Sequence, residues 1–355
     1  MADESTNREA LRWQAAFCAQ SGMTIITRIC TGLADAIDHT TRTGARVLNW
    51  PGDPIADALP LRLVGGVHAL YRSGTAPALS PLFEDREHDP AVIAATLRAI
   101  LIAHDAYLTP WLDGPPQTNE AARSGVLMSG LLALADRFRV GLGTPVRFEL
   151  LEIGSSAGLN LMIDRYRFDL GGVTIGPADA PIRITPEWRG SPPPDVPLAI
   201  QSVRGVDIAP IDLSSDAAAE RLMAYVWIDQ QDRLERATQA IAMARADPPR
   251  LDQGDAADWI EARLAEPQPD GTARVLMHSI VWQYLPPERQ ARIEAAMAAA
   301  GAKATPDRPL GWIAYEADRA MKTHRLAIRS WPGDGVAEYL GGAHPHAAWI
   351  RWERD

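Results

Sequence analysis

The sequence predicts an α/β protein in which an α-helical N-terminal region precedes a doubly wound, mostly parallel β-sheet. From Val146 onward, strand-like and helix-like segments alternate, which is typical of a parallel sheet. Within the stretch 148–160, FELLEIGSSAGLN, a short apolar run stops at a loop of glycine, serine and alanine. The apolar pattern resumes at Leu159–Ile163, so this stretch predicts a buried strand, a tight loop and a helix.

Residues 1–143 are predicted to form the helical region, because apolar residues recur there at helical spacing between loops that contain proline. Three of the expected helices cover residues 61–71, 91–108 and 119–138. The sequence GLGTP at 141–145 then ends this region.

Residues 144–355 are predicted to form the sheet domain. Its expected strands begin at 148 and continue at 203–208, 250–255, 273–280 and 310–315, with shorter helices at 257–264 and 288–300 and one long helix over 214–246. Segments 326–330 and 348–351 are expected to pair as an antiparallel closing unit. The segment 164–200 interrupts the pattern as an insertion, and Gly171-Gly172 within it predicts a β-hairpin.

Composition limits the classes of function. The 355 residues are 46% apolar and 23% charged, as expected for a globular protein, and the net charge of −10 argues against a large nucleic-acid footprint. The N-terminal segment lacks the apolar core of a signal peptide, and no run is apolar enough to span a bilayer. Cys18 and Cys30 give neither a disulfide framework nor metal-ligand spacing. We therefore expect a cytoplasmic protein that binds neither nucleic acid nor membranes and holds no metal.

The loop Gly154-Ser155-Ser156-Ala157-Gly158 is the first candidate for ligand binding. Small residues let a ligand approach the backbone, and a helix that begins after the loop offers unpaired N–H groups to a polar or anionic ligand. The dinucleotide fingerprint fails, because Ser156 and Leu159 stand where its second and third glycines belong, and no Lys-Ser/Thr pair completes a P-loop. A tight turn without a ligand remains the alternative.

The loop resembles the acidic-x-Gly-x-Gly-x-Gly motif of class I S-adenosylmethionine-dependent methyltransferases. Glu152 matches the acid, and Gly154 and Gly158 match the outer glycines, whereas Ser156 departs from the middle one. The resemblance covers about the last 210 residues and implies a Rossmann-like sheet that binds S-adenosylmethionine. It assigns the methionine part of the cofactor to Gly154, Ser155, Ser156 and Gly158. Glu152 would complement the sulfonium charge.

Two acids at the expected strand ends extend this resemblance. Ligands of doubly wound sheets lie outside the carboxyl ends of the strands, and Asp207 and Asp255 follow the second and third strands. By resemblance, Asp207 would bind the ribose diol and Asp255 the adenine amino group. Each acid also fits an ordinary turn or helix N-cap. Asn160 and Ser279 complete the predicted cofactor site.

His278 ends the fourth expected strand and is the predicted general base, because imidazole titrates near neutral pH. Tyr284, shortly after it, is the second predicted catalytic residue. His278 could instead bind neighbouring loop backbone. No Asn/Asp-Pro-Pro-Tyr/Phe tetrad follows the strand, so the pattern of enzymes that methylate base or glutamine amino groups is absent.

A second polar cluster, at the start of the helix that leads into the first strand, is predicted to bind the acceptor substrate. It consists of Thr118, Asn119, Glu120 and Arg123. The alternative is structural, with Thr118 or Asn119 as a helix cap and Glu120 paired to Arg123. Trp188 and Trp227 are expected to pack in the core, and His344 with His346 is a poor metal pair.

Taken end to end, the chain resembles a bacterial family of unknown function, through segments such as QTNEAARSGVL, RGVDIAPIDL, VWIDQQDRLERA and VLMHSIVWQYL. The leading expectation is methylation of a small molecule, with residues 1–143 as a lid on the acceptor side. One alternative is a sensor that binds the cofactor without chemistry. Another is a serine hydrolase in which Ser156 attacks, with His324, His344 or His346 as its base.

Overall fold

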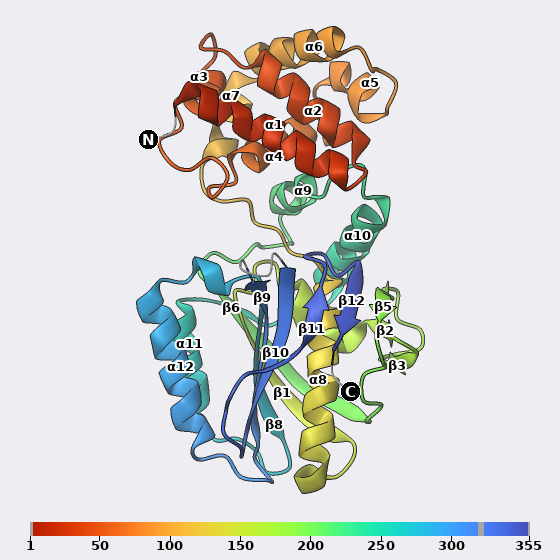
Figure 1. Cartoon of the computed structure of the whole chain (residues 1–355), viewed down its shortest axis with the longest axis vertical. Helices are drawn as coiled ribbons and strands as arrows, with labels where there is room; N and C mark the ends of the chain where they lie inside the picture. Colours follow the sequence, from red (N-terminus) through yellow and green to blue (C-terminus); the bar gives the residue numbers. More distant parts are fainter. Residues whose placement is uncertain (1–2, 319–322, 354–355) are drawn as a thin grey trace. The chain divides into compact units, whose positions relative to one another are not determined.

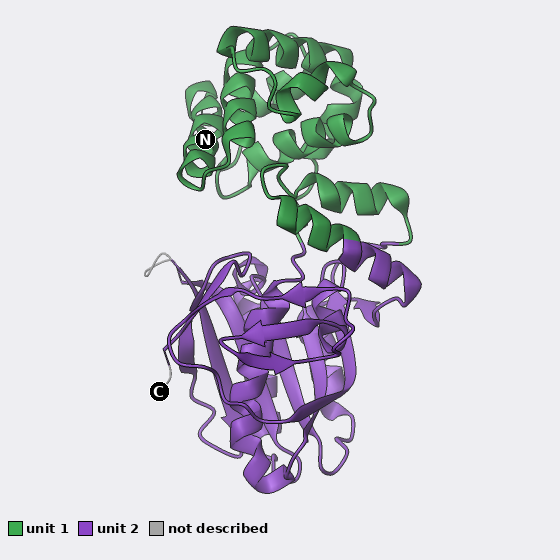
Figure 2. Cartoon of the chain, turned by 90° about the vertical axis from the view of Figure 1, so that its right-hand side faces the viewer, with its two compact units in different colours: residues 1–118, 214–238 green, residues 119–213, 239–355 purple. Residues whose placement is uncertain are grey.

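The computed structural model describes residues 3–318 and 323–353, and the chain forms two compact units (Figure 2). The helical unit comprises residues 1–118 and 214–238, and the sheet unit comprises 119–213 and 239–355. The predicted boundary at residue 143 differs from this division in two places. Residues 119–143 pack with the sheet, and residues 214–238 pack with the helices, although they are far along the chain.

The helical unit confirms the prediction of N-terminal helices. Its helices are α1 (Glu4–Gln20), α2 (Thr24–Ala36), α3 (Arg42–Leu48), α4 (Leu59–Arg72), α5 (Ser80–Phe83), α6 (Pro90–Ala103), α7 (Asp105–Leu108) and α9 (Asp216–Ala224), with 3-10 turns η1 (Pro77–Leu79) and η2 (Thr109–Leu112) (Figure 1). Fully buried side chains from several helices, among them Leu11, Ile26, Leu63 and Leu97, form one apolar core. The unit is therefore held together mainly by burial of the apolar faces of its helices.

The single helix predicted over 91–108 is wrong, because the chain turns at His104 between α6 and α7. The Asp105 carboxylate accepts the backbone N–H groups of Arg42 (3.0 Å) and Thr43 (2.7 Å) at the start of α3, and a straight helix would not place it there. The stretches Pro90–Ala103 and Asp105–Leu112 meet at 82°. Together they have the length and apolar content of a membrane span, but no single helix within residues 3–318 and 323–353 does.

The single helix predicted over 214–246 is also wrong. It divides into α9 and α10 (Gln231–Ala246), with an irregular link at 225–230. Within this link, the two carboxylate oxygens of Asp229 accept the backbone N–H groups of Ile25 (2.8 Å) and Ile26 (3.0 Å) at the start of α2. Met23, at the N-cap position of α2, makes no side-chain cap hydrogen bond, so Asp229, 204 residues after Ile25, supplies the cap.

Replacing Asp229 by alanine is expected to lower the free energy of unfolding of the helical unit by about 1–2 kcal/mol. Both amides would lose their partner, and the N-terminus of α2 would lose a compensating negative charge. Denaturant unfolding followed by circular dichroism measures the change. Asp232→Ala is the matched control, since Asp232 is exposed in the first turn of α10. An Asp229→Ala variant as stable as the wild type would contradict the capping role.

The sheet unit is built on a nine-stranded sheet in the order β5-β12-β11-β10-β9-β8-β1-β6-β7 (Figure 1). Strands β7, β6, β1, β8 and β9 pair in parallel with one another. The pairs β9–β10, β10–β11 and β11–β12 are antiparallel, and β12 pairs in parallel with β5. The strands are β1 (Val146–Ile153), β5 (Glu187–Arg189), β6 (Leu198–Asp207), β7 (Leu251–Gln253), β8 (Ala273–Ser279), β9 (Leu310–Asp318), β10 (Thr323–Trp331), β11 (Glu338–Ala343) and β12 (Trp349–Trp352). The prediction of a large, mostly parallel sheet is confirmed.

Helices cover both faces of this sheet (Figure 1). Helix α8 (Arg123–Leu142) packs on one face, and glycines allow a close approach: a Cβ added at Gly130 would lie 2.9 Å from Ile313, and one at Gly311 would lie 2.7 Å from Leu134. Helices α11 (Ala256–Ala265) and α12 (Pro287–Gly301) belong to the other face, where their apolar residues join those of β1, β8 and β9 in one cluster. The sheet core therefore lies in two layers, and the carboxyl ends of the parallel strands share one edge.

The predicted insertion contains the predicted hairpin. Strands β2 (Arg167–Leu170) and β3 (Val173–Ile175) pair antiparallel around Gly171-Gly172, and β4 (Arg183–Ile184) pairs with β2 in parallel. The predicted pairing of 326–330 with 348–351 is wrong, because β11 lies between these segments and pairs with both β10 and β12.

Candidate functional site

The glycine loop follows β1 as predicted, and its backbone needs small residues. Gly154, Ser156 and Gly158 have φ values of +69°, +54° and +76°, in the left-handed region that favours glycine. A Cβ added at Gly154 would lie 2.2 Å from Val281, and one added at Gly158 would lie 2.8 Å from Pro249. The two glycines therefore make room for side chains of the protein itself. This role could not be predicted from the sequence, where the glycines were assigned to ligand binding.

A helix begins directly after the loop, as expected, but it is a 3-10 helix and not an α-helix. Residues Leu159–Arg165 form η3, a stretch of 3-10 turns with non-helical angles at Met162. Several N–H groups of the loop and of the start of η3 have protein partners: Leu159 N–H donates to Asn119 Oδ1 (2.7 Å), and Ser155 N–H donates to the Val206 carbonyl (3.1 Å). These two N–H groups are therefore not available to a ligand.

Asp207 lies at the loop, as predicted. Its Oδ2 accepts the N–H of Ser156 (2.8 Å) and its Oδ1 accepts the N–H of Ala209 (2.9 Å). A carboxylate has about four acceptor positions, so roughly two remain for a ligand. The next residue, Ile208, is 72% exposed and offers an apolar surface beside the carboxylate. Sequence reasoning missed Ile208, although an apolar residue directly after a strand-end acid was a visible signal.

Asp255 has the capping role that was its structural alternative. It accepts the N–H groups of Ala257 (2.9 Å) and Asp258 (3.2 Å) at the start of α11, and it forms an ion pair with Arg289 (3.1 Å). These contacts explain the acid without a ligand, so any role in binding adenine is secondary to the cap.

Glu152, Asn160 and Ser279 are brought together in a buried polar network on the face of the sheet that α8 covers. Asn160 Nδ2 donates to Glu152 Oε1 (2.9 Å) and to Ser279 Oγ (3.2 Å), and Ser124 Oγ donates to Asn160 Oδ1 (3.0 Å). Glu152 Oε2 is buried and has no partner in the described part of the chain. Burial raises the pKa of Glu152 to about 7, against the opposing effect of the Asn160 hydrogen bond.

His278 projects from the opposite face of β8 and is held by a carboxylate that the sequence analysis missed. Its Nδ1 lies 2.6 Å from Oε1 of Glu316 on β9, and the same oxygen accepts the N–H of Val281 (3.1 Å). A carboxylate in this position accepts the Nδ1 proton, which leaves the lone pair of the neutral imidazole on Nε2. His278 is 1% exposed, and its Nε2 has no partner among the described residues.

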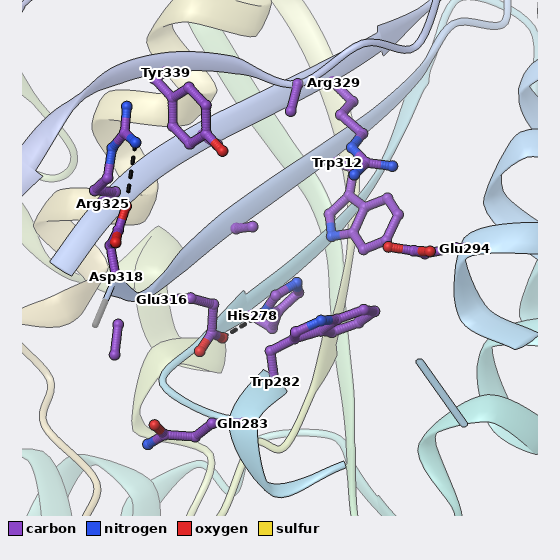
Figure 3. Close-up of a pocket in the computed structure, with 14 residues that line it drawn as sticks. His278, Trp282, Gln283, Glu294, Trp312, Glu316, Asp318, Arg325, Arg329 and Tyr339 are labelled. Carbon is purple, nitrogen blue, oxygen red and sulfur yellow. Dashed lines mark hydrogen bonds and ion pairs between the residues drawn. The ribbon is translucent and has the colours of Figure 1, made fainter. Parts of the chain in front are cut away.

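A cavity of about 450 Å³ lies beside this pair, on the face of β8, β9 and β10 that α12 borders (Figure 3). Trp282 stacks on His278 with the ring centroids 5.2 Å apart, and Trp312 meets both rings at an angle of 60°. Arg325, Arg329 and Tyr339 line the part of the cavity farther along the sheet. The arrangement combines an oriented base with an aromatic, partly charged cavity, which suits binding of a small molecule and removal of its proton.

The remaining predicted residues are not brought into this cavity. Tyr284 is 69% exposed and is not among the residues that line the cavity. Glu120 Oε1 accepts the N–H of Ala122 (3.1 Å), and Arg123 Nε donates to the Pro345 carbonyl (2.9 Å). Thr118, half-buried, is the last residue of the first helical-unit segment.

In the described residues, no general base is hydrogen-bonded to Ser156, the nucleophile of the hydrolase alternative. Ser156 Oγ is buried and has no hydrogen-bond partner in the described residues, whereas a nucleophilic serine needs a base within reach. Among the three candidate bases, His344 uses its Nδ1 to accept the backbone N–H of His346 (3.1 Å) and does not hydrogen-bond Ser156 through it. Trp227 is buried in the helical core, as expected, whereas Trp188 is only half-buried, against Gly171 and Trp352.

No curated protein and no solved structure matches the chain. One family matches nearly its whole length, over residues 8–352, and is described as an uncharacterized protein conserved in bacteria. The chain therefore belongs to this bacterial family, DUF2332.

Proposed function

We propose that the protein is an S-adenosylmethionine-dependent methyltransferase that acts on a small molecule. The observation that carries the proposal is His278, oriented by Glu316, with its unpartnered Nε2 beside a cavity at the carboxyl ends of the parallel strands. The resemblance of the glycine-loop motif to class I methyltransferases supports the choice of cofactor. The sheet order supports it too, because the strand that carries the loop lies between the strands that end in Asp207 and His278.

The fit of the cofactor can be judged from the groups that the strand ends offer. Asp207 retains acceptor positions for a ribose diol, and exposed Ile208 offers a surface on which an adenine ring can pack. Glu152 Oε2 is also an unpartnered acceptor, but it is buried beneath α8 on the face of the sheet opposite His278, so it gives no support to a sulfonium at the His278 cavity. Asp207 and Ile208 are therefore the residues that fit an adenosine. Val281 and Pro249 fill the space next to Gly154 and Gly158, so the methionine part has less room there than the sequence implied.

S-adenosylmethionine supplies an electrophilic methyl group when it is bound. The protein's task is then to orient the acceptor and to remove its proton. His278 Nε2 takes the proton of an acceptor hydroxyl or amine, and Glu316 stabilises the imidazolium that results. Trp282, stacked on the imidazole, restricts the ring to the plane in which Nε2 faces the cavity. The proton leaves to water when the product departs.

Isothermal titration calorimetry tests the cofactor directly. Wild-type protein is expected to bind S-adenosylmethionine and S-adenosylhomocysteine but not NADH, and Asp207→Ala is expected to weaken both by about tenfold, since it removes two ribose hydrogen bonds. Arg308→Gln, at an exposed ion pair with Asp270, is a control that should bind like the wild type. Binding of neither methyl-cycle ligand would exclude the proposal, and binding without any turnover would favour the sensor alternative.

A further inference from the structure

The cavity beside His278 has a shape set by the alternation of side chains on two paired strands. Trp312, Ala314 and Glu316 point to the same side of β9, and their partners on β10 are Arg329, Ala327 and Arg325. The small side chains of Ala314 and Ala327 leave space in the middle of the cavity floor. Larger side chains lie at its two ends, Trp312 and Arg329 at one and Glu316 and Arg325 at the other (Figure 3). The floor of the cavity therefore has an apolar centre and polar ends.

Three buried polar atoms at this cavity have no partner in the described part of the chain. They are His278 Nε2, Trp312 Nε1 and Glu316 Oε2, and the side chains of His278 and Trp312 are 1% and 4% exposed. A buried donor or acceptor without a hydrogen bond costs about 1–3 kcal/mol, and three of them at one cavity indicate that a ligand supplies the missing partners. That ligand needs both a hydrogen-bond donor and an acceptor.

Five charged side chains line the cavity: the carboxylates of Glu294, Glu316 and Asp318 and the guanidinium groups of Arg325 and Arg329. Arg325 is neutralised by Asp318 (3.2 Å), and Glu316 is bound to His278 and Val281. Arg329 lies over the ring of Trp312 (4.7 Å), but no carboxylate of the described residues lies within ion-pair distance of it. Glu294, on α12, is exposed to water, which screens its charge. Arg329 is therefore the guanidinium of the cavity floor that no carboxylate of the described residues pairs with, which makes it the group that can bind a ligand carboxylate.

A cationic ligand fits less well, although aromatic rings and acids often recognise cations. The face of Trp312 is covered by Arg329, and the face of Tyr339 is covered by Arg325 at 3.5 Å. Trp282 stacks on His278. A ligand cation would have to compete with Arg329 and Arg325 for the faces of Trp312 and Tyr339. A ligand carboxylate, in contrast, would bind the guanidinium of Arg329, whose position over Trp312 is already fixed.

We infer that the cavity binds a flat, single-ring carboxylate, with the carboxylate on Arg329 and a hydroxyl or amine at His278 Nε2. Trp312, paired with Arg329 across the strands, supplies a second donor on the same side. From the strand register, the Cα atoms of His278 and Arg329 are roughly 12 Å apart, and their side chains reduce this span to about the length of one substituted ring. The inference deepens the proposed function, on which it rests for the role of this ligand as methyl acceptor.

Calorimetry with 4-hydroxybenzoate and its neutral analogue 4-hydroxybenzamide, without any cofactor, tests the inference. The wild type is expected to bind the acid at least about tenfold more tightly than the amide, because only the acid pairs with Arg329. Arg329→Gln is expected to remove this preference, Arg329→Lys to retain part of it, and Arg308→Gln to leave it unchanged. Circular dichroism confirms that each variant is folded.

Equal binding of acid and amide by the wild type would overturn the inference, and so would binding of neither or an Arg329→Gln variant that keeps the preference. A parallel titration with S-adenosylmethionine separates the two proposals. If the cofactor binds but 4-hydroxybenzoate does not, only the inference about the acceptor fails. If the acid binds through Arg329 and the cofactor does not, only the methyl donor is wrong.

Discussion

Replacing His278 by glutamine is expected to slow methyl transfer by a factor of about 10²–10⁴, while the Kd of S-adenosylmethionine stays unchanged. Glutamine can still accept a hydrogen bond, but it cannot take a proton from the acceptor at neutral pH. The rate is measured as formation of S-adenosylhomocysteine with 4-hydroxybenzoate as the acceptor. His324→Gln is the control, because His324 on β10 is not among the residues that line the cavity. A fully active His278→Gln variant would exclude the histidine as the base.

Glu316 acts through His278, so its replacement has a distinct signature. Glu316→Gln is expected to lower kcat with little change in the KM for the methyl donor, because the amide no longer fixes the imidazole or stabilises its charged form. The double variant His278→Gln/Glu316→Gln should be no slower than His278→Gln alone, because the rate losses of two residues that act as a unit do not add. Losses that multiply in the double variant would indicate independent roles.

The stability of the sheet unit is expected to fall by about 3 kcal/mol as the pH rises from 4.5 to above 7, through Glu152 alone. Burial raises the pKa of this carboxyl from 4.5 to about 7 in the folded chain. Between these values the folded state binds more protons than the unfolded state, so the free energy of unfolding decreases with rising pH. At low pH the carboxyl is neutral in both states and its burial is least costly.

Glu152→Gln keeps the shape of this side chain and its contact with Asn160 while it removes the titration. The variant should therefore lose stability less steeply than the wild type in urea unfolding measured at pH 4.5, 6 and 8. Glu288→Gln is the control, since Glu288 is exposed in the first turn of α12. Identical pH dependence in Glu152→Gln and the wild type would show that the carboxyl ionises without cost.

The sheet could be predicted from the sequence because its buried parallel strands are short apolar runs that end in polar or small residues. Strand β11 was missed because its sequence, EYLGGA, contains two glycines and lacks the β-branched residues typical of strands. The breaks at His104 and at 225–230 were missed for another reason. The acids that accompany them, Asp105 and Asp229, cap helices far away in the sequence, and local patterns do not contain such contacts.

The candidate site could also be predicted only in part from the sequence. The sequence pointed to His278 because it lies at the carboxyl end of an apolar strand, and to Asp207 because it is the last residue of another. Glu316 and Arg329 lie on neighbouring strands, 38 and 51 positions after His278, and only the pairing of β8, β9 and β10 brings them to one cavity. Asp255 is the reverse case: it lies where a ligand-binding acid was expected, but its carboxylate caps the helix that follows it.

The discontinuous helical unit has a consequence for how the protein is made. Trp227 completes its apolar core and Asp229 completes α2, but the ribosome delivers this segment roughly 100 residues after residue 118. At ordinary rates of translation, the first helices wait about 5 to 20 s for it. During that time their unfilled core faces water and other nascent chains. A fragment that stops before residue 214 therefore lacks a piece of its own interior, and we expect it to aggregate when expressed alone.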